Sequence, residues 1–154
     1  MKAVPCSLRV DIPSQTLIWM RGDERRVFPV STSRQGVGFE EGSLKTPTGR
    51  FVVSEKFGDG EPLGAVFRSR VPIGQTAAPG EAPAEDLILT RILWLDGLDP
   101  QNANTRERFI YIHGTNREDL IGQPASHGCI RMRNEDVAAL YDLTPPGTPL
   151  EILA

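Results

Sequence analysis

A cysteine and two histidines lie close together near the C-terminal end of the chain. The run Tyr-Ile-His-Gly at 111–114 is followed by a polar loop and then by Ser-His-Gly-Cys-Ile-Arg at 126–131. A free thiol has a pKa of about 8.5, so it needs a nearby base or cation to become a competent nucleophile at neutral pH. The imidazole of His113 or His127 would supply that base. The spacing therefore predicts a cysteine nucleophile at Cys129.

A glycine immediately precedes this cysteine. Because Gly128 has no Cβ, the backbone there can turn tightly or approach a substrate closely. Amide N–H groups around Cys129 could then converge on a developing oxyanion, where one donor is worth about 3 to 4 kcal/mol. On an extended backbone the side chains of His127 and Cys129 project the same way.

Two other interpretations of these residues remain open at this stage. An isolated histidine is more often structural, in which case His113 ends a strand and His127 makes a local hydrogen bond. Alternatively, His113, His127 and Cys129 could form a three-ligand zinc site with an open position.

The composition is that of a soluble globular protein. The chain has 154 residues, of which 39% are hydrophobic and 24% charged, and we expect a single domain over 1–154 that needs neither a metal nor a disulfide to fold. Its net charge of -3 lacks the basic surplus that binding to nucleic acid requires. No sequence feature indicates a cofactor.

The amino terminus does not resemble a secretion signal. Pro5, Arg9 and Asp11 interrupt any continuous apolar segment there, which predicts a cytoplasmic protein, or a periplasmic one if a leader has been removed. No apolar run approaches the roughly 20 residues that a membrane span needs. We expect Cys6 and Cys129 to be free thiols, with Cys6 in the core.

The first half of the chain favours short strands. Alternating and β-branched segments bounded by turn residues predict a β-meander, then a long loop, then a further strand. These predicted segments are strands at 7–12, 16–20, 25–30 and 50–55 and a loop at 31–48. Trp19 is expected in the core.

The second half alternates loops with apolar strands. Segments rich in Gly and Pro at 58–64 and 72–83 predict long connections that could form the walls of a cleft. An apolar run at 87–95, which includes Trp94, predicts a buried strand, and 109–112 predicts a second one that ends at His113.

Only one segment has a helix signature. Asn134 is a candidate N-cap, acidic residues follow it, and Pro145 stops the helix. A last strand is predicted at 149–153. The chain is therefore expected to be mostly β with one short C-terminal helix.

The motif around the cysteine resembles that of a known family. His-Gly at 113–114 followed by Ser-His-Gly-Cys-Ile-Arg at 126–131 is similar to the signature of the L,D-transpeptidase catalytic domain, or YkuD domain. Thr-Pro-Thr-Gly-Arg-Phe at 46–51 resembles the Thr-Pro-x-Gly-x-Phe segment of that family. The resemblance extends over nearly the whole chain. It implies a β-sandwich of mixed strands with a long loop over the active site.

The resemblance also implies roles for individual residues. Cys129 would be the nucleophile and His113 the general base, oriented by the backbone carbonyl of Gly114. His127 would line the site and assist catalysis. The amides of His127, Gly128 and Cys129 would form the oxyanion hole.

Two further residues of the motif are candidates for substrate binding. Arg131 could neutralise a substrate carboxylate in bidentate fashion, or it could be a buried strut that holds the catalytic loop. Ser126 could contact substrate or make a hydrogen bond within that loop.

The substrate follows from the same resemblance. Members of the family attack the bond between the L-centred carboxyl of diaminopimelate and D-alanine in peptidoglycan stem tetrapeptides, and they form a thioester that an amine or water resolves. Without a visible signal peptide we expect water as the acceptor, which would make the protein an L,D-carboxypeptidase acting on muropeptides in recycling. The alternatives are a true L,D-transpeptidase that cross-links the wall or exchanges D-amino acids, a zinc-dependent hydrolase, and a non-catalytic binder of wall peptides. The oligomeric state is not predicted.

Overall fold

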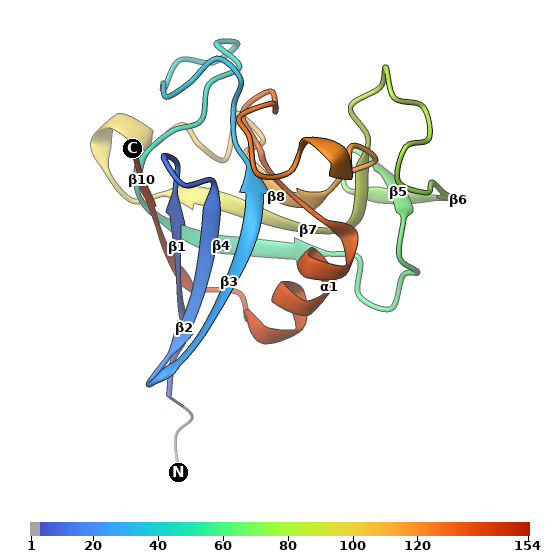
Figure 1. Ribbon diagram of the computed structural model, residues 1–154. Coiled ribbons are helices and arrows are strands. Elements are labelled where there is room, and N and C mark those ends of the chain that lie inside the picture. Colours follow the sequence, from blue (N-terminus) through green and yellow to red (C-terminus); the bar gives the residue numbers. More distant parts are fainter. Residues whose placement is uncertain (1–3) are drawn as a thin grey trace.

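The computed structural model describes residues 4–154, and strands dominate it (Figure 1). The strands are β1 (Ser7–Asp11), β2 (Thr16–Arg21), β3 (Glu24–Ser31), β4 (Gly49–Phe57), β5 (Ala65–Arg68), β6 (Val71–Thr76), β7 (Ile88–Gly97), β8 (Tyr111–Gly114), β9 (Ile130–Met132) and β10 (Pro149–Leu153). The helix α1 spans Asn134–Leu143, and two short 3-10 helices span Pro100–Asn102 and Glu118–Leu120. The predicted mostly β fold with one C-terminal helix is confirmed.

The strands form one sheet that closes on itself. Their order is β4-β10-β1-β2-β3-β9-β8-β7-β5-β6, and β4 also pairs with β7, which joins the two sides into a barrel. The β5–β6 hairpin extends from β7 outside this ring, and Figure 1 shows it at the end of the molecule away from β1. The pairs β1–β10 and β8–β9 are parallel and the other pairs are antiparallel, so the sheet is mixed as expected.

The main core lies inside this barrel. Alternate residues of each strand point inward, and α1 packs against β7 and β8. The predicted burial of Trp19 and Cys6 is confirmed, with 0% and 8% of their surfaces exposed. The largest fully buried side chains are Trp19, Phe51, Leu8, Leu17, Leu89, Ile92, Leu93, Leu95, Ile112, Ile130, Met132 and Leu140.

The register of β8 and β9 decides what faces this core. Ile112 pairs with Ile130, and His113 pairs with Arg131. Both isoleucines are fully buried in the main core. Because successive side chains alternate between faces, His113 and Arg131 lie on the opposite face of the same strands.

Several details differ from the prediction: no strand was expected at β5 or β9, and β8 begins at Tyr111 instead of residue 109. The segment 72–83, expected as a connection, begins with most of β6. This strand is mostly exposed and contains Pro72 and Gly74, residues that sequence patterns associate with loops and that edge strands tolerate.

Asn134 does not cap the helix. The N-cap is Arg133, and Asn134 is the first helical residue. Its backbone N–H instead donates to Oε2 of Glu118 at 2.8 Å, so a carboxylate from another segment satisfies the free end of the helix.

No helix in the part of the chain at 4–154 is both long and apolar enough to cross a membrane.

Candidate active site

Cys129 lies at the end of the polar loop, directly before β9. The preceding Gly128 has φ +121°, a conformation that side chains rarely adopt, so glycine is required for this turn. The cysteine is half-buried. Its Sγ accepts a hydrogen bond from the Tyr111 amide at 3.4 Å and donates to the Phe109 carbonyl at 3.4 Å.

His113 is buried in β8, with 2% of its surface exposed. Its Nδ1 lies 2.6 Å from the carbonyl oxygen of Gly114. A carbonyl only accepts hydrogen bonds, so Nδ1 carries the proton and Nε2 presents its lone pair. Burial lowers the pKa of His113, while Asp86 and the bond to Gly114 oppose this less strongly. The imidazole is therefore neutral at physiological pH and can act as a base.

The strand register brings the thiol and this imidazole to the same face. Cys129 is one residue before Ile130, whose partner is Ile112, so it lies level with Tyr111 and diagonal to His113. Diagonal neighbours in a sheet have Cα atoms roughly 7–8 Å apart. Within residues 4–154 no hydrogen bond joins the two side chains, because the sulfur is held by the backbone at 109 and 111.

The thiol is protonated in this arrangement. Burial raises the pKa of Cys129 to about 11, although the Tyr111 amide and the cations of Arg131 and Arg108 oppose the shift. Together with the lowered pKa of His113, this describes a neutral thiol beside a neutral imidazole.

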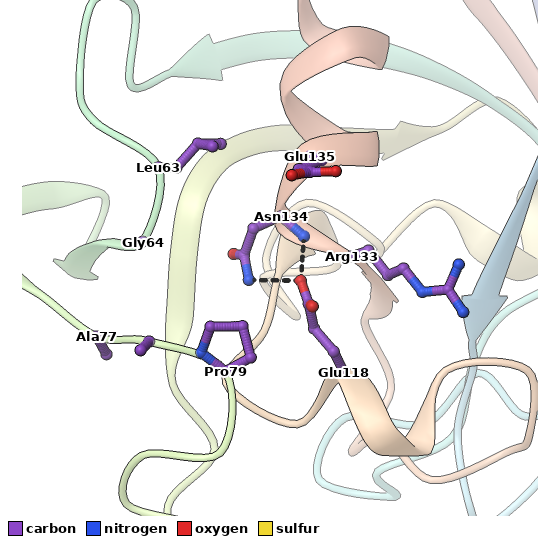
Figure 2. A pocket seen from close by; sticks show the side chains of 9 residues that line it. Leu63, Gly64, Ala77, Pro79, Glu118, Arg133, Asn134 and Glu135 are labelled. Carbon is purple, nitrogen blue, oxygen red and sulfur yellow. Dashed lines mark hydrogen bonds between the residues drawn. The ribbon is translucent and has the colours of Figure 1, made fainter.

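A buried polar network supports the carbonyl that orients His113. A Cβ at Gly114 would collide with the Asn134 amide and with the Leu89 carbonyl, so only glycine fits there. Figure 2 shows Asn134 donating from its backbone and its Nδ2 to Glu118. Its Oδ1 accepts from Thr90 at 2.6 Å. Because Nδ2 also donates to the Thr115 carbonyl at 2.9 Å, the network fixes the backbone that follows His113 and Gly114.

The pocket in Figure 2 lies beside this network and contains neither Cys129 nor His113. Its lining comes from the start of α1, from Glu118 and from the segments next to β5 and β6. The lining residues are Leu63, Gly64, Ala77, Ala78, Pro79, Glu118, Arg133, Asn134 and Glu135.

Thr46, the first residue of the Thr-Pro segment, contacts the loop that precedes Cys129. Its Oγ1 accepts from the Ser33 amide at 2.9 Å and donates to the Gly128 carbonyl at 3.0 Å. In a trans peptide the C=O and the next N–H point in opposite directions. By holding the Gly128 carbonyl on the buried side, Thr46 turns the Cys129 N–H away from itself. The sequence identified this segment but gave no role to its threonine.

Ser126 is directed into its own loop. It is fully buried, its Oγ donates to the Cys129 carbonyl at 2.6 Å, and it accepts from the Gly128 amide at 3.2 Å. Both partners belong to the turn that presents the thiol. The geometry thus matches the structural alternative for Ser126.

Arg131 and His127 share one carboxylate. Arg131, whose side chain is 5% exposed, pairs with Asp86 at 2.7 Å, and His127 Nδ1 lies 3.0 Å from the other oxygen of Asp86. Asp86 comes from the connection before β7, which Asn116 anchors through bonds from its Nδ2 to three backbone carbonyls. The buried guanidinium thus holds this connection beside the site. No sequence signal singled out Asp86.

The loop at 31–48 lies on another side of the site from the connection that carries Asp86. Arg108 donates to the carbonyls of Gly38 and Lys45 and to the hydroxyl of Ser43. With Thr46 on Gly128, these bonds fix the loop against the cysteine side of the site.

The alternative of a zinc site finds no support in the geometry. Across the described residues, no three His, Cys, Asp or Glu side chains form a group that could hold a metal ion. His127 Nδ1 pairs with Asp86 and His113 Nδ1 with the Gly114 carbonyl, so neither of these nitrogens is available as a metal ligand. Both cysteines are free.

Sequence comparisons show which family the chain resembles. Residues 7–152 match the family described as the L,D-transpeptidase catalytic domain, YkuD. The Escherichia coli protein "Probable L,D-transpeptidase YcfS" is 30% identical over 135 residues, which cover 82% of this chain and 37% of that protein. "Probable L,D-transpeptidase ErfK/SrfK" of Salmonella typhimurium is 48% identical over 46 residues, covering 30% of this chain and 15% of that protein. The chain thus spans well under half the length of these relatives.

Solved structures share the fold. L,D-transpeptidase 3 from Mycobacterium tuberculosis, in complex with a faropenem-derived adduct, aligns with a TM-score of 0.65 at 17% identity over 98% of this chain and 61% of that one. An L,D-transpeptidase from Xylanimonas cellulosilytica aligns with a TM-score of 0.62 at 19% identity over 99% of this chain and 62% of that one.

Proposed function

Because the chain belongs to the L,D-transpeptidase catalytic domain family, we propose that it cleaves the diaminopimelate–D-alanine bond of peptidoglycan stem tetrapeptides through a thioester on Cys129. The main support is the β8–β9 register, which brings the thiol and the buried imidazole of His113 to one face of the sheet. Neither group needs a charge at rest.

Acylation begins with proton transfer from the thiol to Nε2 of His113. In the resting arrangement the sulfur is bonded to the backbone at 109 and 111, so it must turn about the Cα–Cβ bond of Cys129 toward the imidazole. Catalytic hydrogen bonds are often long in a free enzyme and shorten when substrate binds. The sulfur then attacks the carbonyl carbon of the diaminopimelate residue.

The oxyanion that forms is stabilised by amides of the 127–129 turn. The Cys129 N–H points away from the carbonyl that Thr46 holds, so it is available to the substrate. The Gly128 amide already has a partner in Ser126. We therefore assign the leading role in the oxyanion hole to the Cys129 amide, with that of His127 beside it.

The tetrahedral intermediate collapses when the C–N bond breaks. The imidazolium of His113 returns its proton to the departing amine, D-alanine leaves, and the acyl group remains on sulfur. Water or an amine then attacks the thioester, with His113 again as the base. Hydrolysis gives a tripeptide, whereas an amine gives a cross-link or an exchanged terminal residue.

Arg131 and Ser126 support this chemistry indirectly. Arg131 is paired with Asp86 and Ser126 is bonded within the turn, so we propose that both hold the catalytic loop in shape. Neither side chain needs to touch substrate.

The test is incubation of the protein with a disaccharide tetrapeptide, followed by mass spectrometry of products and of trapped acyl-enzyme. We expect release of D-alanine and a mass adduct on Cys129. Cys129→Ala should lose at least about a thousandfold in turnover, as expected when a nucleophile is removed. Cys6→Ala, which removes the other thiol, is the matched control and should stay active.

The products also identify the acceptor. Tripeptide alone indicates water, which is the outcome expected from the sequence, whereas dimers or exchanged D-amino acids without tripeptide would contradict it. Full turnover by Cys129→Ala would refute the nucleophile assignment itself.

A further inference from the structure

An arginine projects over the active-site face from the tip of the β5–β6 hairpin. Arg68 and Val71 form the closing pair, so Ser69 and Arg70 are the two turn residues, with φ of 49° and 66°. Two positive φ values define a turn that normally takes Asn or Gly. An arginine there carries a conformational cost, because its Cβ crowds the following carbonyl oxygen. Contacts of its side chain must offset that cost.

The guanidinium of Arg70 is held by aromatic side chains. It lies 4.5 Å from the ring centre of Trp94 and 5.4 Å from that of Phe109. Its Nη1 donates to the Tyr111 hydroxyl at 2.9 Å. Burial raises the pKa of Tyr111, so the phenol stays neutral and leaves the positive charge uncompensated.

A second arginine lies against the same indole, and its charge is neutralised by a carboxylate. Arg106 lies 4.3 Å from the ring centre of Trp94, and it forms an ion pair with Glu55. Within the described residues Arg70 has no carboxylate at ion-pair distance. One of the two guanidinium groups is therefore neutralised by the protein and the other is not.

Tyr111 connects this cation to the nucleophile. Its backbone amide donates to Cys129 Sγ, and its hydroxyl accepts from Arg70. Phe109, which is 52% exposed, contacts both groups: its carbonyl accepts from the thiol, and its ring lies beside the Arg70 guanidinium. A substrate bound at the sulfur would thus extend along an aromatic surface toward a fixed positive charge.

We propose that Arg70 binds a carboxylate of the acyl-donor peptide, at a distance from the bond that is cleaved. This inference rests on the proposed function, because the donor is then a stem peptide that carries several carboxylates. Arginine suits this task because its planar guanidinium pairs with a carboxylate through two parallel hydrogen bonds. Arg131, the candidate from the sequence, already has its carboxylate in Asp86.

The experiment compares Arg70→Gln with Arg68→Gln, which removes the same charge from the other side of the same turn. Substrates are the tetrapeptide and three versions in which the glutamyl, the diaminopimelate side-chain or the terminal carboxylate is amidated singly. For the wild type, one amidation should raise KM by about tenfold to a hundredfold, the range of a hydrogen bond to a charged group. Arg70→Gln should show that same rise on the unmodified peptide and no further rise on that amide.

Arg68→Gln should discriminate among the peptides as the wild type does, and Arg70→Lys should recover part of the affinity. In all variants kcat should stay near the wild-type value, and melting temperatures check the fold. If Arg70→Gln still discriminates among the three amides as the wild type does, the inference is wrong. That result leaves the proposed function intact, since the latter fails only if Cys129→Ala remains active.

Discussion

The two faces of β7, β8 and β9 are built from alternate residues of the same strands and differ completely in character. The inner face carries Ile112 and Ile130, which are fully buried in the main hydrophobic core. The outer face carries Cys129, His113 and Arg131, together with an aromatic cluster around Trp94. Packing on the inner face fixes the register, and the register fixes which side chains meet on the outer face. The core therefore affects the site through the strand register. A substitution of an inner side chain that keeps the register should leave the outer face unchanged.

Apart from Cys129→Ala, the largest loss of activity is expected for a substitution of His113 on the outer face. His113→Gln should lower kcat/KM by about a hundredfold to ten-thousandfold, the range for a general base. His127→Gln is the matched control, because that imidazole is exposed and bonded to Asp86; it should have a much smaller effect.

The pH profile sharpens the same prediction. The base acts when neutral, so activity falls as pH drops through its pKa, and burial lowers the pKa of His113 below its ordinary 6.5. We expect the acid limb of kcat/KM in the wild type to lie below pH 6.5 and to disappear in His113→Gln. An acid limb that persists in this variant would assign it to another group.

The next effect concerns Thr46, which is distant from Gly128 in sequence but donates a hydrogen bond to its carbonyl. Thr46→Val removes the hydroxyl that holds the Gly128 carbonyl, so the Cys129 amide loses its fixed direction. We expect kcat to fall by about tenfold to a hundredfold, less than for deletion of an oxyanion donor, with KM little changed. Thr46→Ser should keep most of the activity, as should Thr48→Val in the same segment. Equal losses in the serine and valine variants would contradict a role for the hydroxyl.

A smaller effect, on stability, is expected at the outer-face ion pair. Asp86→Asn leaves the buried guanidinium of Arg131 without a counter-charge, which should cost about 1–3 kcal/mol in the free energy of unfolding. Asp119→Asn breaks the exposed pair with Arg117 and should have less effect. Urea titration of both variants measures the difference; equal stabilities would show that burial of Arg131 does not make the pair important.

The smallest effect belongs to the inner face. Ile130→Val, next to the nucleophile in sequence, should cost about 1 kcal/mol of stability and leave kcat unchanged, because its side chain points into the core. The measurement is denaturant unfolding together with steady-state kinetics. A fall in kcat beyond a few-fold would mean that the two faces are not separable.

The sequence located the reactive residues better than it located their supports. Cys129 was a candidate because a thiol with two histidines nearby in sequence is a recognisable pattern, whereas the choice of His113 as the base and of the Gly114 carbonyl as its partner came from the family resemblance. Strands rich in β-branched residues were predicted because residue type and alternation are local signals. In contrast, β5, β6 and β9 are short or exposed and lack a periodic signal. The assignment of Asn134 as a helix cap was wrong because its side chain bonds to segments far away in the chain.

By itself, the sequence determined which groups are available for chemistry, namely a thiol, an imidazole and a glycine turn in a mostly β chain, since these depend on residue type and local spacing. Only the tertiary structure decided that Asp86 neutralises Arg131, that Thr46 holds the Gly128 carbonyl, and that Arg70 lies uncompensated over Trp94. Each of these contacts joins segments that are distant in sequence, and strand pairing and core packing alone bring them together.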